Sequence, residues 1–594
     1  MADQNQVTAA HVIVTVNEPG TKQVTAGHAV AEINTTTVTG QVTAAHAIVE
    51  VAPTAVTHQV TAAHALVETD FGATHQVTAA HAIVALDTPA THRVSAGHVI
   101  VTTRTPDPSN QLIIEVDWDD DGSYTEEATY LVTASGSNRL RNAVSGYVGR
   151  SQIDRASIVF DNTSNRFSTL LTGAALYSDT AGGKAYHRNV RINVDVAGAG
   201  EQRVFTGVIK IPKENTVAPG QPQKIVFEAR SREEEYLNRF RSTTQANFAT
   251  YHDDGKTESE LISQWLTDAG VTLADIEVDP GVFVIPWGWI DDESPIVDCW
   301  DLASAAGGVF YATQDGKFVY ENASHWQLEP HDTVRETLTS TEFASLEMFY
   351  DDKELARSVI SQISAREIDV AQVVYSIEAA FVIPPTETKT IKAQLRAPLY
   401  ELTAVDLKAT TSGGTNITSD QGIVRTDNAQ HLEFAITNNN ATHDAIISRM
   451  DVSGRPVIGG INLEVTQNTT STFWNNHTHR SKRLPSNVYV QTLPQGEMLA
   501  TLFRDQLNEP RLMFRARNCV GDPGRRLGDR VTVSDSNLLT TARAAFIIGI
   551  DWRLSAQGFY QDLTLIDAQD LFEYDGNYAT LDTDTLGGGK RIFY

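Results

Sequence analysis

Six copies of one short unit fill residues 6–104 and constrain the fold of this chain more than any other feature. The first copy reads Gln-Val-Thr-Ala-Ala-His, and the copies follow one another at a step of 17 or 18 residues. A β-branched run and a connector rich in Thr, Pro, Ala or Gly follow each copy. A fixed step this short is typical of solenoids and arrays, in which one strand per repeat packs on the next. The copies end at His11, His28, His46, His64, His81 and His98.

Two arrangements of these repeats are open from the sequence. In the first, the strands stack on one another into a compact β-solenoid. In the second, each strand adds to the sheet edge of a different neighbour, and the segment is a multivalent strap. Roughly 100 extended residues at about 3.3 Å each span on the order of 300 Å, so a strap can follow a tube or encircle a ring. A flexible adhesive decoration is a third alternative.

We interpret the six repeat histidines as a repeat interface. A metal site needs two or more imidazoles within about 2 Å of one ion. No carboxylate or thiolate that would complete such a site recurs at a matching step in all six copies. We therefore predict structural, hydrogen-bonded histidines, with a metal ladder and a pH-responsive interface as the alternatives.

An acidic turn follows the first strand after the repeats. Asp117, Asp119 and Asp121 have the spacing of the first half of a calcium loop, with a glycine directly after them for the sharp turn. The bidentate glutamate expected at loop position twelve is missing, because Ala128 stands there; the two glutamates just before it are candidate substitutes. A structural Ca²⁺ site and a solvated acidic β-turn both stay open, and no other cofactor is predicted.

Residues 106–235 are expected to form an antiparallel barrel or sandwich. Four segments show period-2 or short apolar patterning between Gly, Asn, Asp and Ser residues. Such segments are typical of β-strands with one buried face. They are residues 112–116, 156–162, 190–195 and 204–210.

The pattern changes to α+β over residues 236–335. Thr257-Glu258-Ser259-Glu260 is a capping box ahead of an apolar helix, and Gly270 is placed to end that helix. Ser294 supplies an N-cap and Pro295 the first position of a second helix. A hairpin turned at Gly316 follows.

Two pairs of residues need an interpretation of their own. Cys299 and Cys519 are too few for a disulfide framework, so we predict buried reduced thiols. Trp287 and Trp289 are interpreted as core or interface residues, with a ligand platform as the alternative.

The remaining chain is predicted to be β-rich as well. Residues 336–376 and 453–568 form a second β domain, and residues 377–452 form a sandwich inserted into it. Residues 569–594 are a C-terminal tail that is either a docking peptide or disordered. The fold class is therefore mainly β with a smaller α+β domain, and the short β-strand repeats occupy residues 1–105.

The order of these pieces resembles the tail-hub proteins of long-tailed bacteriophages, which are tail-tip or baseplate-hub minor tail proteins. The resemblance covers residues 112–568 and is specific in order more than in any single motif. The repeats and the C-terminal tail fall outside it. The segments that carry the resemblance are 117–122 (Asp-Trp-Asp-x-Asp-Gly), 156–168 (Ala-x-Ile-x-Phe-Asp-Asn, then Arg-Phe-Ser), 176–177, 190–192, 205–207, 528–533 and 546–554.

The resemblance implies a structural virion protein rather than an enzyme. It implies a hub that closes the tail tube, connects it to host-recognition proteins and opens for DNA passage. The implied partners are two further copies of the chain in a homotrimer, the tail tube, the distal tail ring, the tape measure and the fibres. DNA passes the channel only transiently, and assembly takes place in the host cytoplasm without stable membrane insertion. The alternative is a receptor-binding or adhesin tail protein whose repeats contact the host or partner proteins.

Charge and motif content agree with that implication. The net charge of −28 argues against a protein that grips nucleic-acid phosphates, and is compatible with a channel wall that repels DNA. We find no nucleophile elbow, phosphate-binding glycine loop, zinc HExxH motif or apolar run of transmembrane length. Carboxylates are abundant, so a glycosidase pair stays open from the sequence.

Overall fold

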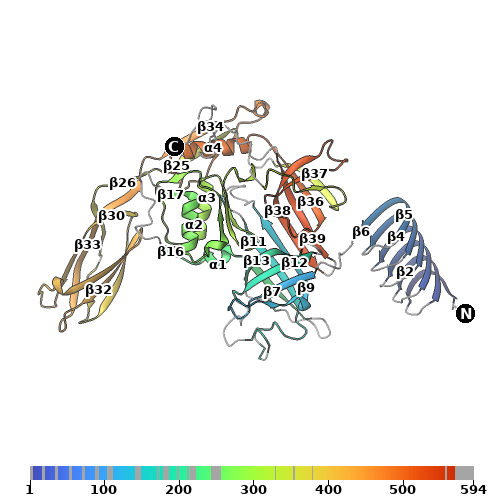
Figure 1. Cartoon of the computed structure of the whole chain (residues 1–594), viewed down its shortest axis with the longest axis horizontal. Coiled ribbons are helices and arrows are strands. Elements are labelled where there is room, and N and C mark those ends of the chain that lie inside the picture. The colour runs from blue at the N-terminus through green and yellow to red at the C-terminus, as the bar shows by residue number, and fades with distance from the viewer. Residues whose placement is uncertain are drawn as a thin grey trace. The chain divides into compact units, whose positions relative to one another are not determined.

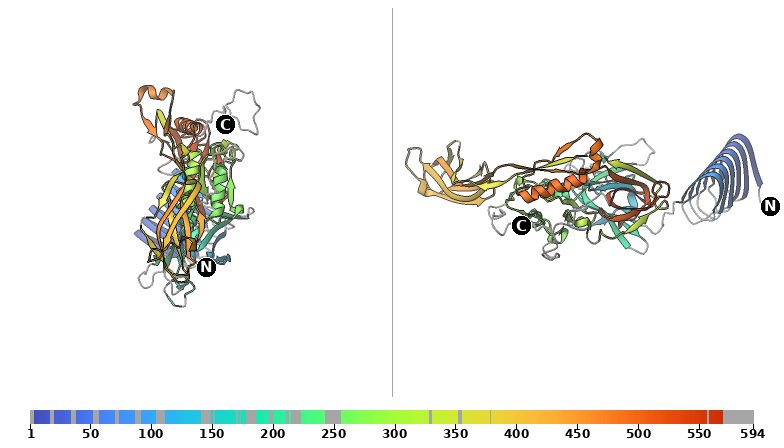
Figure 2. Two further views of the ribbon diagram at one scale, coloured as in Figure 1. Left: turned by 90° about the vertical axis from the view of Figure 1, so that its left-hand side faces the viewer. Right: turned by 90° about the horizontal axis from the view of Figure 1, so that it is seen from above.

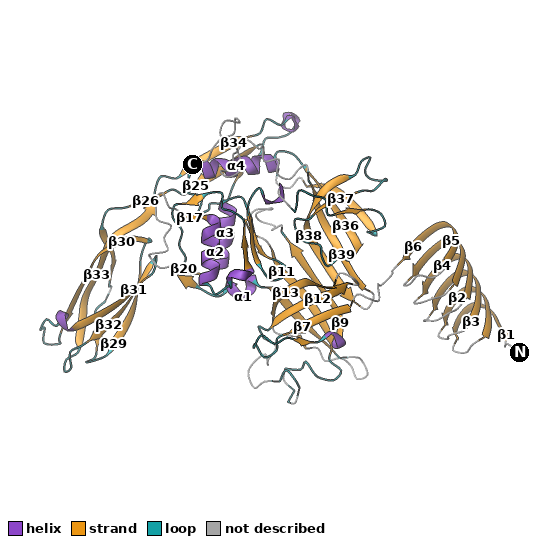
Figure 3. Cartoon of the chain, viewed as in Figure 1, coloured by secondary structure: helices purple, strands orange, loops and turns teal. Residues whose placement is uncertain are grey.

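The computed structural model of the chain describes residues 4–568 apart from short gaps, and for residues 4–103 it describes the backbone alone. Strands dominate and helices are few, so the fold is mainly β, as predicted (Figure 3). The chain forms two compact units, one made chiefly of the repeats and one of the remaining residues, and each is described by itself. The gaps are residues 17–19, 34–37, 52–56, 70–73, 87–91, 104–110, 141–148, 151, 170, 173, 178–185, 197–199, 211–212, 215–222, 243–255, 328–329, 352–354, 378 and 556–557.

The repeats form one parallel six-stranded sheet in chain order. Equivalent residues of successive repeats pair, so the Cα of His11 lies opposite the Cα of His28, and the same register continues to His98. The strands are β1 (Gln4–Val16), β2 (Gly20–Ile33), β3 (Val38–Val51), β4 (Thr57–Thr69), β5 (Thr74–Leu86) and β6 (His92–Thr103).

Short connections require each repeat strand to curve into a coil. Val16 ends β1 and Gly20 opens β2, and this separation of four positions spans at most roughly 14 Å. A straight strand of 13 residues would measure on the order of 40 Å, yet β2 begins beside the start of β1. The two ends of β1 must therefore come close together, and Figure 2 shows the curved strands stacked side by side. This is the solenoid, the first of the two arrangements considered from the sequence.

Residues 111–231 form a first β module of antiparallel strands. Every strand predicted in this region is present, and side chains of β11 alternate between buried and more exposed positions. Its core is aromatic: the rings of Phe160 and Phe167 stack at 4.7 Å, and Phe227 packs edge-on against both. The strands are β7 (Gln111–Val116), β8 (Thr125–Glu126), β9 (Leu131–Arg139), β11 (Gln152–Asp161), β12 (Asn189–Val196), β13 (Gly200–Ile209), β14 (Lys213–Glu214) and β15 (Lys224–Ser231).

A second β module continues the sheet of the first. β38 pairs with β9, so both modules belong to one 14-stranded sheet. At this seam Gly136 leaves no room for a side chain, since a Cβ there would lie 2.4 Å from the Trp552 indole. Trp552 is buried and donates its Nε1–H to Asn138 at 3.3 Å. The strands are β23 (Glu336–Leu338), β24 (Ser345–Asp351), β36 (Arg511–Val520), β37 (Arg530–Val533), β38 (Arg543–Ser555) and β39 (Gly558–Asp567).

The predicted capping box and hairpin are confirmed in the α+β region. The Thr257 N–H donates to the Glu260 carboxylate at 2.8 Å, the Glu260 N–H donates to the Thr257 hydroxyl at 3.4 Å, and Gly270 follows the helix with φ of +94°. Ser294 is the N-cap residue of the second helix and Pro295 its first residue, as predicted, but the buried Ser294 hydroxyl makes no hydrogen bond. The elements are α1 (Glu233–Leu237), α2 (Glu258–Asp268), β18 (Ile276–Val278), α3 (Pro295–Ala305), β10 (Gly149–Arg150), β21 (Val309–Ala312) and β22 (Phe318–Glu321).

One hydrophobic core joins these helices to segments far along the chain. Trp265 and Trp300 are buried beside Tyr489 and the apolar face of α4. Trp287 and Cys299 are buried as well, so the interpretation of Trp287 as a core residue and of the cysteine as a buried free thiol is confirmed; Cys519 is buried and free too. The further elements here are β16 (Arg241–Ser242), β17 (Lys256–Thr257), β19 (Val284–Ile285), β20 (Asp291–Glu293), β25 (Ser358–Ile363), β34 (Leu463–Asn468), β35 (Ser481–Arg483) and α4 (Leu493–Leu507).

A two-sheet sandwich is inserted between β25 and β34 (Figure 1). The long strand β33 pairs with β26, β27, β28 and β30, while β32 pairs with β29 and β31. Phe434 and Met450 are fully buried in its core. The strands are β26 (Arg366–Ile368), β27 (Gln372–Ser376), β28 (Phe381–Ile383), β29 (Thr388–Gln394), β30 (Leu399–Thr410), β31 (Gln421–Asp427), β32 (His431–Asn438) and β33 (Ala445–Gly459). Within the described part of the chain, no helix is long and apolar enough to cross a membrane.

A buried carboxyl makes the α+β core sensitive to pH. Asp298 lies in the first turn of α3, and its Oδ1 accepts the Tyr489 hydroxyl at 2.6 Å. Burial raises the pKa of Asp298 to about 7, and the charges of Glu293 and Asp301 act in the same direction. In the unfolded chain an aspartate titrates near 4. The folded chain therefore holds this proton more tightly, and its stability falls as pH rises from about 4 to about 7.

We expect Asp298→Asn to remove this pH dependence. At pH 3 the carboxyl is neutral in both the folded and the unfolded chain, so the natural chain and the variant should differ least there. Between pH 3 and pH 8 the natural chain should lose roughly 4 kcal/mol of stability relative to the variant, because its carboxyl becomes a carboxylate that is costly to bury. Urea unfolding at both pH values measures the change, and a stability difference between the two chains that is the same at pH 3 and pH 8 would contradict the assignment.

Candidate functional site

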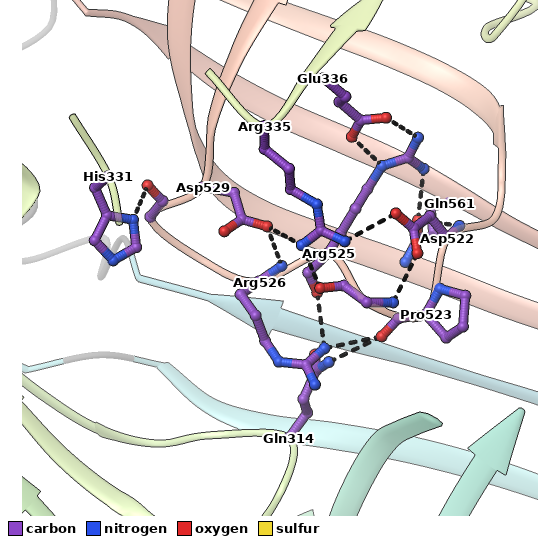
Figure 4. A network of polar contacts seen from close by, with 12 residues as sticks. Gln314, His331, Arg335, Glu336, Asp522, Pro523, Arg525, Arg526, Asp529 and Gln561 are labelled. Atoms are coloured by element: carbon purple, nitrogen blue, oxygen red, sulfur yellow. Dashed lines mark hydrogen bonds and ion pairs between the residues drawn. The ribbon is translucent and has the colours of Figure 1, made fainter. Parts of the chain in front are cut away.

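The turn between β36 and β37 brings together charged side chains from three parts of the second unit (Figure 4). Its sequence, Gly521-Asp522-Pro523-Gly524, is typical of a tight turn. Asp522 closes the turn by accepting the backbone N–H of Gly524 at 2.8 Å. Gly528 has φ of +84°, a conformation that L side chains rarely adopt. The backbone therefore presents Arg525 and its neighbours from defined positions.

Arg525 lies at the centre of the network. Its Nε and Nη2 donate to the two Glu336 carboxylate oxygens at 2.6 and 2.9 Å. Its Nη1 donates to the Gln561 side chain at 2.8 Å and to the Val520 carbonyl at 2.7 Å. Burial lowers the pKa of Arg525, but the hydrogen bond to Glu336 and the charges of Glu336 and Asp522 together act against it, so the pKa is raised. Arg525 is buried and Glu336 is half-buried, and a two-pronged ion pair of this kind resists being pulled apart.

Arg335 holds the same turn from the opposite strand. Its guanidinium pairs with Asp529 at 2.6 Å and with Asp522 at 3.0 Å, and it also donates to the Gly524 carbonyl. Arg335 directly precedes β23, and its own backbone N–H donates to the Arg530 carbonyl at 2.8 Å. The turn is therefore clamped along its whole length.

Gln314 lies in the β21–β22 hairpin and connects the turn between β36 and β37 to the first β module. Its amide donates to the Pro523 carbonyl at 3.2 Å and to the Arg203 carbonyl of β13 at 3.0 Å. The backbone carbonyl of Gln314 accepts a hydrogen bond from the Thr206 hydroxyl at 2.8 Å. The neighbouring Asp315 pairs with Arg526 at 3.4 Å. The β21–β22 hairpin is thus bound to the first β module and to the second at one point.

The side chains of this arrangement are bonded mainly to one another and to backbone groups. Its arginines are paired with carboxylates and carbonyls, and its amides bridge backbone groups. Among the described residues of the network, none is a nucleophile with a general base beside it. We name these residues the polar junction: Gln314, Arg335, Glu336, Asp522, Pro523, Arg525, Arg526, Asp529 and Gln561. Sequence patterns missed it because its partners lie far apart along the chain.

The acidic turn after β7 is closed largely by its own backbone. Asp117 is buried, and its carboxylate accepts the N–H groups of Asp121 and Gly122 at 3.2 and 3.0 Å. Asp119 and Asp121 are exposed, and Asp121 accepts the Ser123 N–H at 2.8 Å. The Ca²⁺ site at these three aspartates stays a prediction.

The two glutamates considered as substitute ligands have different surroundings. Glu127 is buried, and its carboxylate pairs with Arg166 at 2.7 Å and accepts the Trp118 indole N–H at 2.9 Å. Glu126 is exposed on β8. The Glu127 carboxylate is therefore already bonded to side chains around the aromatic core of the first module.

Sequence reasoning overlooked a second group of ligand-type side chains. Glu321, His325 and His331 each offer one ligand atom, and these atoms lie within 4.8 Å of one another. Glu321 ends β22, and His325 opens the 3₁₀ helix η4 (His325–Gln327). Among the described residues no other group of three His, Cys or carboxylate side chains meets this distance. The spacing of four positions between Glu321 and His325 was the one sequence feature that could have indicated this group.

The repeat histidines occupy one register position of β1–β6, so their backbones are paired from His11 to His98. Their side chains lie outside what the structure describes. The repeat interface at these six residues stays a prediction.

No protein-family model and no curated protein matches the sequence. The chain is similar to solved structures of tail proteins. The 43 kDa tail protein of prophage MuSo2 from Shewanella oneidensis is 9% identical, over 78% of this chain and 100% of that chain, with a TM-score of 0.42. A tail protein from Neisseria meningitidis MC58 is 10% identical, over 78% and 98%, with a TM-score of 0.43. Prophage tail protein gp18 from Listeria monocytogenes EGD-e is 9% identical, over 77% and 94%, with a TM-score of 0.36.

Proposed function

We propose that this chain is a structural protein of a bacteriophage tail tip. In this role it forms a hub that closes the tail tube, connects the tube to host-recognition proteins and opens for DNA passage. The proposed location is the virion, after assembly in the host cytoplasm. The proposed partners are other copies of the chain in a trimer, the tail tube, the distal tail ring, the tape measure and the fibres.

The observation that carries the proposal is the continuous sheet that unites the two β modules. Pairing of β38 with β9 makes one 14-stranded sheet, and the Gly136–Trp552 contact interlocks its halves. The polar junction then ties this sheet to the β21–β22 hairpin. Such a body suits a wall that must keep its shape while partners pull on it. A threefold ring of chains with two modules each presents six modules, which matches a sixfold tube.

Charge supports a channel wall in particular. The net charge of −28 makes non-specific binding of DNA to this surface unfavourable. DNA then meets the protein only in transit. The polar junction is saturated by its own partners, which supports a structural role over an enzymatic one.

Single-particle electron microscopy of the purified chain, averaged without imposed symmetry, tests the proposal. We expect a threefold ring or cup with an axial opening. A monomer or a slender fibre without a channel would contradict the hub.

Deletion of residues 1–105 separates the hub from the adhesin alternative. A hub that needs its repeats for assembly yields no complete particles after the deletion. An adhesin yields intact particles that fail to adsorb to the host. Particle counts by microscopy and adsorption assays on the same lysates distinguish the two results.

A further inference from the structure

We infer that Glu321, His325 and His331 form a site for one divalent metal ion of the zinc class. The inference does not depend on the proposed function, because it concerns three side chains inside one unit. The Nε2 of His325 faces Oε1 of Glu321 at 3.6 Å, and the two imidazole rings lie 4.9 Å apart between centroids. Zinc bound to nitrogen and oxygen at about 2.0–2.2 Å brings two ligands to roughly 3.4 Å from each other. The observed spacing therefore already approaches that of a ligand pair.

Hydrogen bonding fixes which nitrogen of each ring is available. Nδ1 of His331 lies 2.7 Å from the Gly528 carbonyl, and Nδ1 of His325 lies 2.8 Å from the Asp279 carboxylate. A carbonyl and a carboxylate only accept hydrogen bonds, so both Nδ1 atoms are donors. In the neutral ring Nε2 then carries the lone pair. In that tautomer the Nε2 atom of His325 faces the Glu321 carboxylate at 3.6 Å, so a cation bound between them would be shared by both groups.

His431 shows what an ordinary structural histidine looks like in the same protein. Its side chain is more deeply buried than that of His325, and its Nδ1 also donates to an aspartate, Asp291, at 2.8 Å. Its Nε2, however, accepts the amide N–H of Asn428 at 2.9 Å. Both ring nitrogens of His431 are thereby hydrogen-bonded to protein groups, whereas Nε2 of His325 faces only the Glu321 carboxylate, at 3.6 Å.

Each proposed ligand also has an outer partner that holds it in place. The Glu321 carboxylate accepts the Tyr311 hydroxyl at 2.5 Å and the Trp326 indole N–H at 2.9 Å. The Asp279 carboxylate orients His325, and the backbone of Gly528 orients His331. Metal sites in proteins are supported in this way, with the second nitrogen of each histidine bonded to a carboxylate or carbonyl.

The ligand set selects the kind of ion. Two imidazoles and one carboxylate favour zinc and neighbouring transition ions over Mg²⁺ and Ca²⁺, which prefer oxygen ligands. Three protein ligands leave one position for water. The His325 side chain is 21% exposed, which gives the ion a route to the site. A bound ion would join β22, η4 and the segment at His331, whose ring contacts the Gly528 end of the turn in the polar junction.

The test uses the full chain and zinc, with His325→Asn and His331→Asn as variants. Asparagine keeps a donor at the place of Nδ1 but has no atom at the place of Nε2. After dialysis against zinc and then buffer, we expect the natural chain to hold one zinc ion per chain more than either variant. Zinc should also raise the melting midpoint of the natural chain by several degrees and leave that of both variants unchanged. Zinc bound at other histidines remains in all samples and cancels in the difference.

His431→Asn is the matched control and should retain the full zinc content. Mg²⁺ should leave the midpoint of the natural chain unchanged. Co²⁺ added to the natural chain provides a measurement that no variant's folding can affect, and we expect visible absorption bands of a low-coordinate nitrogen and oxygen site. Equal zinc content in the natural chain and both variants, or the absence of those bands, overturns the inference.

Discussion

Replacement of Arg525 by Met is expected to lower the free energy of unfolding by about 3–5 kcal/mol. Methionine replaces the apolar stem of the arginine, but Glu336 loses its two-pronged partner and Gln561 loses the guanidinium donor. Removal of one member of a buried pair leaves the other charge without compensation, which is the costly case. Urea unfolding of the natural and variant chains, followed by tryptophan fluorescence, measures the loss.

Two companion variants show whether burial is the cause. Arg449 also pairs with two aspartates, at 2.7 and 3.1 Å, but on the surface. Its replacement by Ala should leave unfolding close to that of the natural chain, because exposed pairs contribute little. The double change Arg525→Met with Glu336→Leu should recover much of the stability, since no buried charge is then left alone. A double variant as unstable as the sum of the single changes would argue against the ion pair as the source.

Replacement of Gly207 by Ala is expected to destabilise the first β module by about 3 kcal/mol. Gly207 pairs with Ser231 where β13 meets β15, and a Cβ there would lie 2.0 Å from the Arg230 carbonyl oxygen. Backbone atoms cannot rotate away as a side chain can, so the two strands must separate. Overpacking typically costs 1–3 kcal/mol, and a clash with a paired backbone belongs at the upper end. We expect faster hydrogen exchange of the backbone amides in β13 and β15, and a lower melting midpoint of the chain.

Gly459→Ala is the control for this prediction. Gly459 also lies in a strand, at the end of β33, but the space around its Cβ position is open and its φ is not in the left-handed region. This variant should change neither the midpoint nor the exchange of the first module. If both alanine variants behave alike, the close approach at Gly207 is not what requires glycine there.

Features that depend on neighbours in the chain were predictable from the sequence. Strand alternation in the first module, the Thr257–Glu260 capping box and the hairpin at Gly316 each involve residues only a few positions apart. Their physical causes act locally, through side-chain period, capping and glycine conformation. Ser294 occupies the predicted N-cap position, but its hydroxyl makes no capping hydrogen bond. Whether a hydroxyl reaches a backbone N–H depends on its rotamer and surroundings, which sequence spacing does not specify.

The polar junction shows what only tertiary structure decides. Arg525 and Glu336 are 189 positions apart, and Gln314 and Pro523 are 209 positions apart. No local pattern links them, and an isolated arginine in a Gly-Pro turn reads as a solvated surface charge. The proposed metal ligands depend on tertiary structure in the same way, since the hydrogen bond that orients His331 comes from Gly528, 197 positions away.

Some features of the repeats were predictable from the sequence, and one was decided only by the tertiary structure. Their step of 17 or 18 residues, and hence one strand per unit, was determined by the sequence alone, because identical units must take identical local structure. That β1 pairs with β2 rather than with a neighbouring protein was decided only by the fold. Backbone hydrogen bonds to a strand edge are the same whichever chain supplies the partner. The short connections, which bring both ends of each strand together, favour the next repeat as that partner.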